Sequence, residues 1–398
     1  MSEDWRQSTW GDEISLEYGK AIRGYQDAVA PYRVFGSNGP IGWTESALAD
    51  GPGVILGRKG AYRGVQFSRE PFFVIDTAYF VKPKAELDMR WLYYAIIHHK
   101  LGEIDDGSPI PSTTRAAVYV RAVDVPPLPE QSAIAATLGA LDDKIELNRK
   151  MNAKLEAMAR ALFRDWFVDF GPTRAKMAGD APYLSPDLWS LFPDRLDDEG
   201  KPEGWEVRPL VDCFDLLMGQ SPPGDTYNDS GEGLPFFQGR TDFGFRFPEN
   251  RKYCSAPTRL AEKGDTLVSV RAPVGDINLA SERCCIGRGV AALRHKGNGA
   301  SYTYYTAWSL QEELRQFENT GTVFGAINKK QFEALSTFNP GPAVSEAFEE
   351  IVGSLDSRIE TNERESRTLA QTRDLLLPRL MSGELRVADA GMLLEEVA

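Results

Sequence analysis

One helical pattern occurs twice in this chain, and it limits the possible folds more than any other feature. Residues 141–163 read LDDKIELNRKMNAKLEAMARALF, and residues 355–377 read LDSRIETNERESRTLAQTRDLLL. Apolar residues recur around both segments in steps of three and four, which is the heptad spacing of a coiled coil. Helices over about residues 130–167 and 344–381 are therefore predicted, each roughly 57 Å long at 1.5 Å per residue.

The predicted seam has the same phase in both helices. Its members are Ile134, Leu138, Leu141, Ile145, Asn148, Leu155, Leu162 and Trp166, and then Phe348, Val352, Leu355, Ile359, Asn362, Leu369, Leu376 and Leu380. A helix of this length needs a partner along its seam, and each helix offers the other a matching one. The simplest arrangement is an intramolecular antiparallel coiled coil with one globular part at each end.

Two details of the seam leave alternatives open. Asn148 and Asn362 share one seam position, where a buried amide would penalise wrong registers; alternatively, the seam drifts and both amides face solvent. Large apolar residues also lie off the seam, and either another subunit's helices or the globular parts would cover them. These residues are Met151, Met158, Phe163 and Phe167.

Further matched segments surround the helices in the same order, so the chain consists of two half-copies. Trp5 and Gly19 match Trp205 and Gly219, residues 53–65 match 265–277, and residues 107–129 match 321–343. Short β-branched and aromatic runs between Gly and Pro turns predict mixed α/β globular parts. Expected strands cover residues 53–56, 72–75 and 266–270, and expected helices cover residues 89–99 and 302–317.

Composition sets wider limits. A chain of 398 residues with 42% hydrophobic content holds two or three domains at roughly 100 to 200 residues per domain. The four cysteines form no CxxC pair, and the first residues, MSEDWRQSTW, lack an apolar signal segment. We expect a soluble, cytoplasmic protein.

Charge alone argues against a nucleic-acid partner, because the net charge is −13. Residues 51–69, GPGVILGRKGAYRGVQFSR, are nevertheless basic and contain no acidic residue. Such a stretch is either a solvated loop or a local binding surface.

Signatures of catalysis are missing from the sequence. It contains no G-x-x-x-x-G-K-[ST] phosphate loop and only three scattered histidines, so neither ATP binding nor a metal site is expected. Pro193, Asp194, Glu199 and Lys201 match the residue types of a nuclease, but a segment with five prolines (residues 171–204) is a poor support for converging carboxylates.

The complete arrangement resembles the specificity subunits of type I DNA restriction-modification systems. The resemblance covers nearly the whole chain and rests on the order of its segments, among them SNGPIGW, GRKGAYRG, VPPLPEQSAIAATLGALDDKIELNRK, LFPDRLDDEGKPEGWEV and LLLPRLMSGELRV. The second helix departs from the pattern at its start, where PGPAVSEAFEEI replaces the PLPEQ form.

The resemblance implies an α+β fold with two pseudo-repeated target-recognition domains joined by the two helices. The expected boundaries are recognition domains at 1–128 and 205–342, spacer helices at 129–170 and 343–385, a Pro-rich connector at 171–204 and a tail at 386–398. It also implies a non-catalytic subunit that reads a bipartite double-stranded DNA target. Two modification subunits would use S-adenosylmethionine to methylate adenine, and restriction subunits would use ATP.

Candidate DNA contacts are Arg, Lys, Asn, Gln, Thr and Tyr residues in or beside Gly-rich turns of the matched segments, because guanine is read by Arg or Lys and adenine by Asn or Gln. In the first domain they are Lys20, Asn38, Arg58, Lys59, Tyr62, Arg63, Thr113, Thr114 and Arg115. In the second they are Gln220, Gln238, Arg240, Arg271, Arg288, Asn328, Lys329 and Lys330.

The main alternative function is a non-catalytic scaffold whose two domains bind other proteins. A DNA reader with this acidic total would bind DNA weakly by itself and with a steep dependence on salt, whereas a protein scaffold would not.

Overall fold

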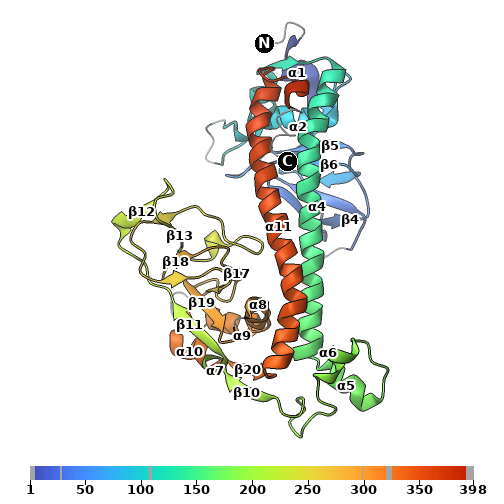
Figure 1. The fold of residues 1–398 in the computed structure, drawn as a ribbon. Coiled ribbons are helices and arrows are strands. Elements are labelled where there is room, and N and C mark those ends of the chain that lie inside the picture. The colour runs from blue at the N-terminus through green and yellow to red at the C-terminus, as the bar shows by residue number, and fades with distance from the viewer. Residues whose placement is uncertain are drawn as a thin grey trace. The chain divides into compact units, whose positions relative to one another are not determined.

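A computed structural model describes residues 5–26, 29–105, 107, 110–297, 299–319 and 325–390. The chain divides into two units, Met1–Arg149 with Asn362–Ala398, and Lys150–Thr361. Two 40-residue helices, α4 (Leu128–Phe167) and α11 (Pro342–Met381), contribute to both units (Figure 1). Both helices were predicted, to within two residues at each end. Of the predicted tail, residues 391–398 lie outside the described part.

The first unit contains a globular part that we call domain 1. Its strands are β1 (Arg6–Thr9), β2 (Ile14–Tyr18), β3 (Tyr32–Gly36), β4 (Gly39–Thr44), β5 (Gly53–Gly57), β6 (Val65–Ser68), β7 (Phe72–Val74), β8 (Ala78–Pro83) and β9 (Ala122–Val125). Its helices are α1 (Trp10–Glu13), α2 (Met89–His98) and α3 (Arg115–Tyr119). A four-stranded sheet has the order β2-β8-β5-β6, a three-stranded sheet has the order β4-β3-β7, and β1 pairs with β9.

The second unit contains domain 2, whose strands are β10 (Glu206–Pro209), β11 (Phe214–Met218), β12 (Tyr227–Asn228), β13 (Leu234–Phe237), β14 (Tyr253–Cys254), β15 (Leu260–Ala261), β16 (Thr266–Ser269), β17 (Ile277–Leu279), β18 (Cys284–Ile286), β19 (Val290–His295) and β20 (Ser336–Asn339). Its helices are α7 (Leu210–Cys213), α8 (Ala300–Ser309), α9 (Gln311–Gln316) and α10 (Lys329–Glu333). The connector before it forms α5 (Gly171–Ala178) and α6 (Pro186–Ser190).

The two domains repeat one topology. The sheet β11-β19-β16-β17 of domain 2 matches β2-β8-β5-β6 of domain 1, and the ribbon β10-β20 matches β1-β9. Each domain also has a second sheet with one parallel pair, β3 with β7 and β13 with β18. The matched sequence segments therefore form matched elements, and the expected mixed α/β character of both domains is confirmed.

One predicted helix is interrupted. Residues 302–317 were expected to form a single helix, but α8 ends at Ser309, and α9 begins at Gln311. The hydroxyls of Thr303, Thr306 and Ser309 each donate to a backbone carbonyl three or four residues earlier. Such bonds compete with the helical ladder and favour a bend, which explains the break at Leu310.

Segments of α4 and α11 contact one another within each unit, and in the first unit their order is antiparallel. In the first unit Asp142 pairs with Arg373 at 2.6 Å, and the Asn148 amide donates to the Asn362 carbonyl at 3.4 Å. In the second unit the Phe163 and Phe348 rings lie 5.6 Å apart between centroids.

Most of the sixteen predicted seam residues are buried, while Leu155, Leu162, Leu355 and Leu369 are half-buried. Asn148 and Asn362 are each only 1% exposed, so the alternative in which both amides face solvent is wrong. Phe163 and Phe167 are buried in the core of domain 2, whereas Met158 is 58% exposed. For the two phenylalanines, the globular part supplies the cover.

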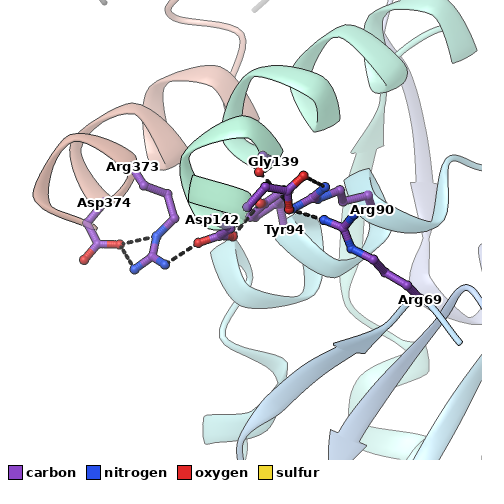
Figure 2. Close-up of polar contacts among 8 residues, drawn as sticks. Arg69, Arg90, Tyr94, Gly139, Asp142, Arg373 and Asp374 are labelled. Atoms are coloured by element: carbon purple, nitrogen blue, oxygen red, sulfur yellow. Dashed lines mark hydrogen bonds and ion pairs between the residues drawn. The ribbon is translucent and has the colours of Figure 1, made fainter. Parts of the chain in front are cut away.

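Two aspartates of α4, Asp142 and Asp143, fix the helix to domain 1, and Figure 2 shows Asp142 between Tyr94 and Arg373. Asp142 accepts from the Tyr94 hydroxyl of α2 at 2.5 Å and from Arg373 of α11. Its neighbour Asp143 pairs with Arg90 and Arg69, and Arg90 also donates to the Gly139 carbonyl at 2.9 Å. Both aspartates belong to the LDDKIELN segment, but only Asp142 is repeated, as Asp356, whereas Ser357 stands opposite Asp143.

Candidate nucleic-acid interface

Two adjoining hollows in domain 2 contain most of the residues predicted there. The first, about 360 Å³ in volume, is lined by Ser221, Gln238, Gly239, Arg240, Thr241, Arg271, Ala272, Pro273, Arg288 and Gly289. The second, about 350 Å³, is lined by Met218, Gly219, Val270, Arg271, Arg288, Ala326, Ile327, Asn328, Lys329 and Gln331. Arg271 and Arg288 line both.

The strand ends of the repeated sheet place these two arginines. Arg271 follows β16 and forms a single antiparallel bridge with Ala326, next to the start of α10. Arg288 lies in the turn between β18 and β19, where the Val290 amide donates to the Gly287 carbonyl at 3.0 Å. Both side chains are exposed.

Gly219 allows the turn after β11 to lie against the turn that carries Arg288. A Cβ at Gly219 would lie 2.2 Å from the Gly287 carbonyl oxygen, and one at Gly19 in domain 1 would lie 2.1 Å from the Ile75 carbonyl oxygen. Both distances are shorter than any real contact of a Cβ, so only glycine fits. The matched glycines in the sequence thus mark one repeated turn.

The cationic groups of the hollows differ in their partners. Within the described part of the chain, neither the Arg271 nor the Arg288 guanidinium has a hydrogen bond or ion pair. Arg240, in contrast, donates to Asp276 at 2.6 Å, and Lys329 pairs with Glu333 at 3.4 Å. Because all arginines stay charged at physiological pH, Arg271 and Arg288 are the groups best prepared to bind an anion or a guanine edge.

The other predicted residues of domain 2 take different places. Asn328 caps α10, since its side-chain oxygen accepts from the Gln331 amide at 3.0 Å. Gln220 and Lys330 are exposed but line neither hollow. The sequence prediction missed Ser221, Thr241 and Gln331, although each directly follows a predicted residue, namely Gln220, Arg240 and Lys330.

Domain 1 presents related residues at the equivalent positions. Lys59 follows β5 and bridges Ser112, as Arg271 follows β16 and bridges Ala326. Thr114 caps α3 through its hydroxyl, as Asn328 caps α10. Three further predicted residues, Lys20, Asn38 and Tyr62, are exposed on turns, and Tyr62 has 78% of its surface accessible.

Two predicted residues of domain 1 point inward. Thr113 is completely buried, with its hydroxyl 3.3 Å from the Ile104 carbonyl oxygen. The Arg63 guanidinium donates to the carbonyls of Gly60, Gly102 and Ile104 at 2.7 to 3.0 Å. In this conformation both side chains stabilise the loop, and neither is available to a duplex.

Arg58 and Arg115 both lie against the ring of one tyrosine, Tyr18. Their guanidinium carbons are 4.9 and 4.1 Å from the Tyr18 ring centroid, and Tyr18 itself is 47% exposed. Burial raises the pKa of the neighbouring Tyr79 to about 12, so its phenol stays neutral. Tyr18 is a surface aromatic that the prediction missed; it ends a predictable strand, but nothing in the sequence shows its stacking.

The residues of nuclease type do not converge. Asp194 pairs with Lys176 at 3.0 Å, whereas Glu199 pairs with Lys201. Among the described residues, no group of three or more His, Cys, Asp or Glu side chains is arranged to hold a metal ion.

In the described part of the chain, no helix combines the length and apolar character that a membrane span requires.

Comparisons with known proteins agree with this arrangement. A model of the type I restriction modification DNA specificity domain matches residues 35–157 and 202–369. The chain is 25% identical over 382 residues to the HindI type I restriction enzyme specificity subunit of Haemophilus influenzae, covering 79% of this chain and 81% of that one. It is 24% identical over 406 residues to the MjaIX specificity subunit of Methanocaldococcus jannaschii, covering 96% and 88%.

A further relative matches part of the chain, and a solved structure shares its fold. The MjaX specificity subunit of M. jannaschii is 29% identical over 273 residues, and this match spans 67% of the chain but only 59% of the relative's length. The crystal structure of the type I restriction-modification S subunit from M. genitalium superposes with a TM-score of 0.61 at 17% identity, covering 95% and 96% of the two chains, so the fold is shared. The chain belongs to the family of type I restriction-modification DNA specificity subunits.

Proposed function

We propose that the chain recognises a bipartite double-stranded DNA sequence, with one half-site for each domain. The observation that carries the proposal is the repeated placement of basic, amide and hydroxyl side chains at one edge of the repeated sheet. Arg271 and Arg288 in domain 2 are the strongest instance, because both guanidinium groups are exposed and have no partner among the described residues. Lys59 occupies the equivalent of Arg271 in domain 1.

The helices supply the spacing in this proposal. α4 and α11 would form one antiparallel coiled coil along their length and hold the recognition domains, residues 1–128 and 205–342, at a fixed separation. The family membership, the antiparallel contacts in the first unit and the contact of Phe163 with Phe348 in the second support it. A spacer of this kind predicts a target with a gap of fixed length and no sequence preference.

Catalysis would belong to other chains. Two modification subunits would bind S-adenosylmethionine and methylate adenine, and restriction subunits would hydrolyse ATP and cleave DNA. The chain itself would be non-catalytic. Partner subunits would also contribute cationic groups that neutralise phosphates, which accounts for DNA recognition by a chain with a net charge of −13.

A double variant tests the assignment of the DNA surface. Arg271→Ala with Arg288→Ala should weaken binding of the cognate duplex at least about tenfold, because each good base or phosphate contact of an arginine contributes on the order of 1–3 kcal/mol. Binding would be measured across a salt series, with and without a modification subunit. Arg208→Ala is the matched control, since Arg208 is exposed on β10 and lines neither hollow.

Two results would contradict the proposal. One is an unchanged affinity of the double variant for the cognate duplex. The other is a wild-type chain that, even with a modification subunit, shows no salt-dependent binding of DNA.

A further inference from the structure

The loop that carries two of the candidate DNA contacts also contains a buried arginine. Gln238 and Arg240 lie at the start of the segment between β13 and β14, and Arg246 lies six residues beyond Arg240. The Arg246 side chain is only 1% exposed. Arginine is almost never buried this deeply unless it is paired, so its contacts identify its role.

Arg246 contacts three helices of its unit. Its guanidinium donates to the Tyr305 hydroxyl of α8 at 2.7 Å and lies 3.2 Å from a carboxylate oxygen of Asp356 on α11. The guanidinium carbon lies 3.9 Å from the centre of the Tyr304 ring. Glu156 of α4 is 3.8 Å away and is itself paired with Arg160.

The charges of this cluster balance, with two guanidinium groups and two carboxylates. Burial nevertheless raises the pKa of Asp356, so burying its charge is unfavourable. Apolar residues of similar size often stabilise a buried site at least as well as an ion pair does. What the arginine adds is direction, because its hydrogen bond to Tyr305 and its ion pair with Asp356 favour one position of the loop. Its Nε and Nη1 atoms have no hydrogen-bond partner among the described residues.

Backbone hydrogen bonds connect the position of Arg246 with that of the candidate contacts in the same loop. The Leu279 amide of β17 donates to the Arg246 carbonyl at 2.8 Å. The Asn278 side chain accepts from the backbone amide of Gly244 and donates to the backbone carbonyl of Gly244. Nearer the start of the loop, the Asp242 carboxylate accepts from the Gln238 amide at 2.9 Å. The segment from Gln238 to Arg246 is therefore tied to β17 near its end, and a bond within the segment fixes the turn at its start.

The repeated cluster in the first unit obtains its arginine from another place. Asp142 is the repeat counterpart of Asp356 and likewise accepts from a tyrosine hydroxyl, that of Tyr94, but its arginine is Arg373 of α11. The repeat counterpart of Arg373 in α4 is Ala159, which is buried and cannot supply a charge. In the second unit the recognition loop provides the arginine instead.

We propose that Arg246 is a positioning residue for DNA specificity: by binding Tyr305 and Asp356 it fixes the loop that presents Gln238 and Arg240 to the half-site of domain 2. The inference rests on the proposed function, because it explains the base preference of domain 2 and therefore requires that domain 2 reads DNA. Arg246 itself touches no DNA.

The test compares base preferences in a random-sequence duplex library, bound by the full chain together with a modification subunit. Arg246→Met combined with Asp356→Asn removes one charge of each sign and leaves the Glu156–Arg160 pair. The matched control, Arg373→Met with Asp142→Asn, makes the same change in the first unit. The positions read by domain 2 are those whose preference changes in Arg271→Ala.

In the Arg246 variant, we expect the ratio of affinities for preferred and other bases at the domain 2 half-site to fall at least about fivefold. That is the smallest effect expected from losing a single specific base contact. The half-site of domain 1 and the slope of affinity against salt should not change. The control should leave the domain 2 half-site unchanged. Measurement well below the unfolding temperature of each variant separates this effect from loss of structure.

Three outcomes would overturn the inference. The first is a variant that keeps the wild-type preference at both half-sites, and the second is one in which both half-sites lose discrimination equally. The third is a control that weakens the domain 2 half-site as much as the Arg246 variant does. A wild-type chain without any sequence preference would instead overturn the proposed function itself.

Discussion

At the scale of single residues, Asp142 and Asp143 show how neighbouring carboxylates of the repeated segment serve different contacts. Asp142 joins α2 to α11 through Tyr94 and Arg373. Asp143 instead pairs with Arg90 and Arg69. The hydrogen bonds from Arg90, followed by those from Arg69, lower the pKa of Asp143 to about 2.

This shift predicts a pH-dependent effect of Asp143→Asn. A lowered pKa in the folded chain means that Asp143 stabilises the fold fully above its unfolded pKa of about 4 and loses this contribution as pH falls toward 2. The destabilisation by Asp143→Asn should be about 1 kcal/mol or less at pH 7, because the side chain is 40% exposed and screened by solvent.

Denaturant unfolding of both chains between pH 7 and pH 3 measures this difference. It should be constant down to about pH 4.5 and then shrink. A difference that grows as the pH falls would contradict the assigned ion pairs.

The sequence predicted residue types at the candidate interface better than it predicted their directions. Lys59 and Arg63 lie in the same basic turn, yet Lys59 is exposed, whereas the Arg63 guanidinium bonds three backbone carbonyls. Two of those carbonyls belong to Gly102 and Ile104, which are distant in sequence. No local pattern reports such a contact, because it depends on how separate segments pack.

At the scale of elements, heptad spacing predicted both long helices because it reports which face of a helix is buried. It did not predict the break at Leu310, since hydroxyl bonds to the helix backbone leave no periodic signal. Nor could it decide what covers Phe163 and Phe167, which pack against Tyr302 and Phe348 within their own unit. Burial of an off-seam residue depends on the tertiary fold.

The buried asparagines of the helix pair predict a trade between stability and register. Asn148 donates to the Glu365 carboxylate at 2.8 Å as well as to the Asn362 carbonyl, and such bonds form in one register alone. Asn148→Leu with Asn362→Leu should raise the unfolding temperature, because two buried amides give way to apolar contacts worth on the order of 1 kcal/mol.

The same variant should no longer pair its two helices in a single register. We expect size-exclusion chromatography with light scattering to find assemblies that the wild-type chain does not form. Asn250→Leu, a change at an exposed loop asparagine, is the control for added hydrophobicity. A lower unfolding temperature together with unchanged assembly would contradict the register role.

At the scale of the whole molecule, internal repetition was the most informative property of the sequence. It predicted the order of elements in both domains, because each matched segment encodes the same strand, turn or helix. It also located one difference between the domains, because Lys59 and Arg271 occupy equivalent positions with different side chains. Two domains of one topology with different surface residues are suited to two different half-sites.

The central claim is that one chain reads DNA at two separated places. Its most direct test is to sequence the duplexes that the full chain, with a modification subunit, selects from a random library. The account predicts two short runs of preferred bases separated by a gap of constant length without preference, with only one run altered by Arg271→Ala. A single uninterrupted run of preferred bases, or alteration of both runs by that substitution, would contradict it.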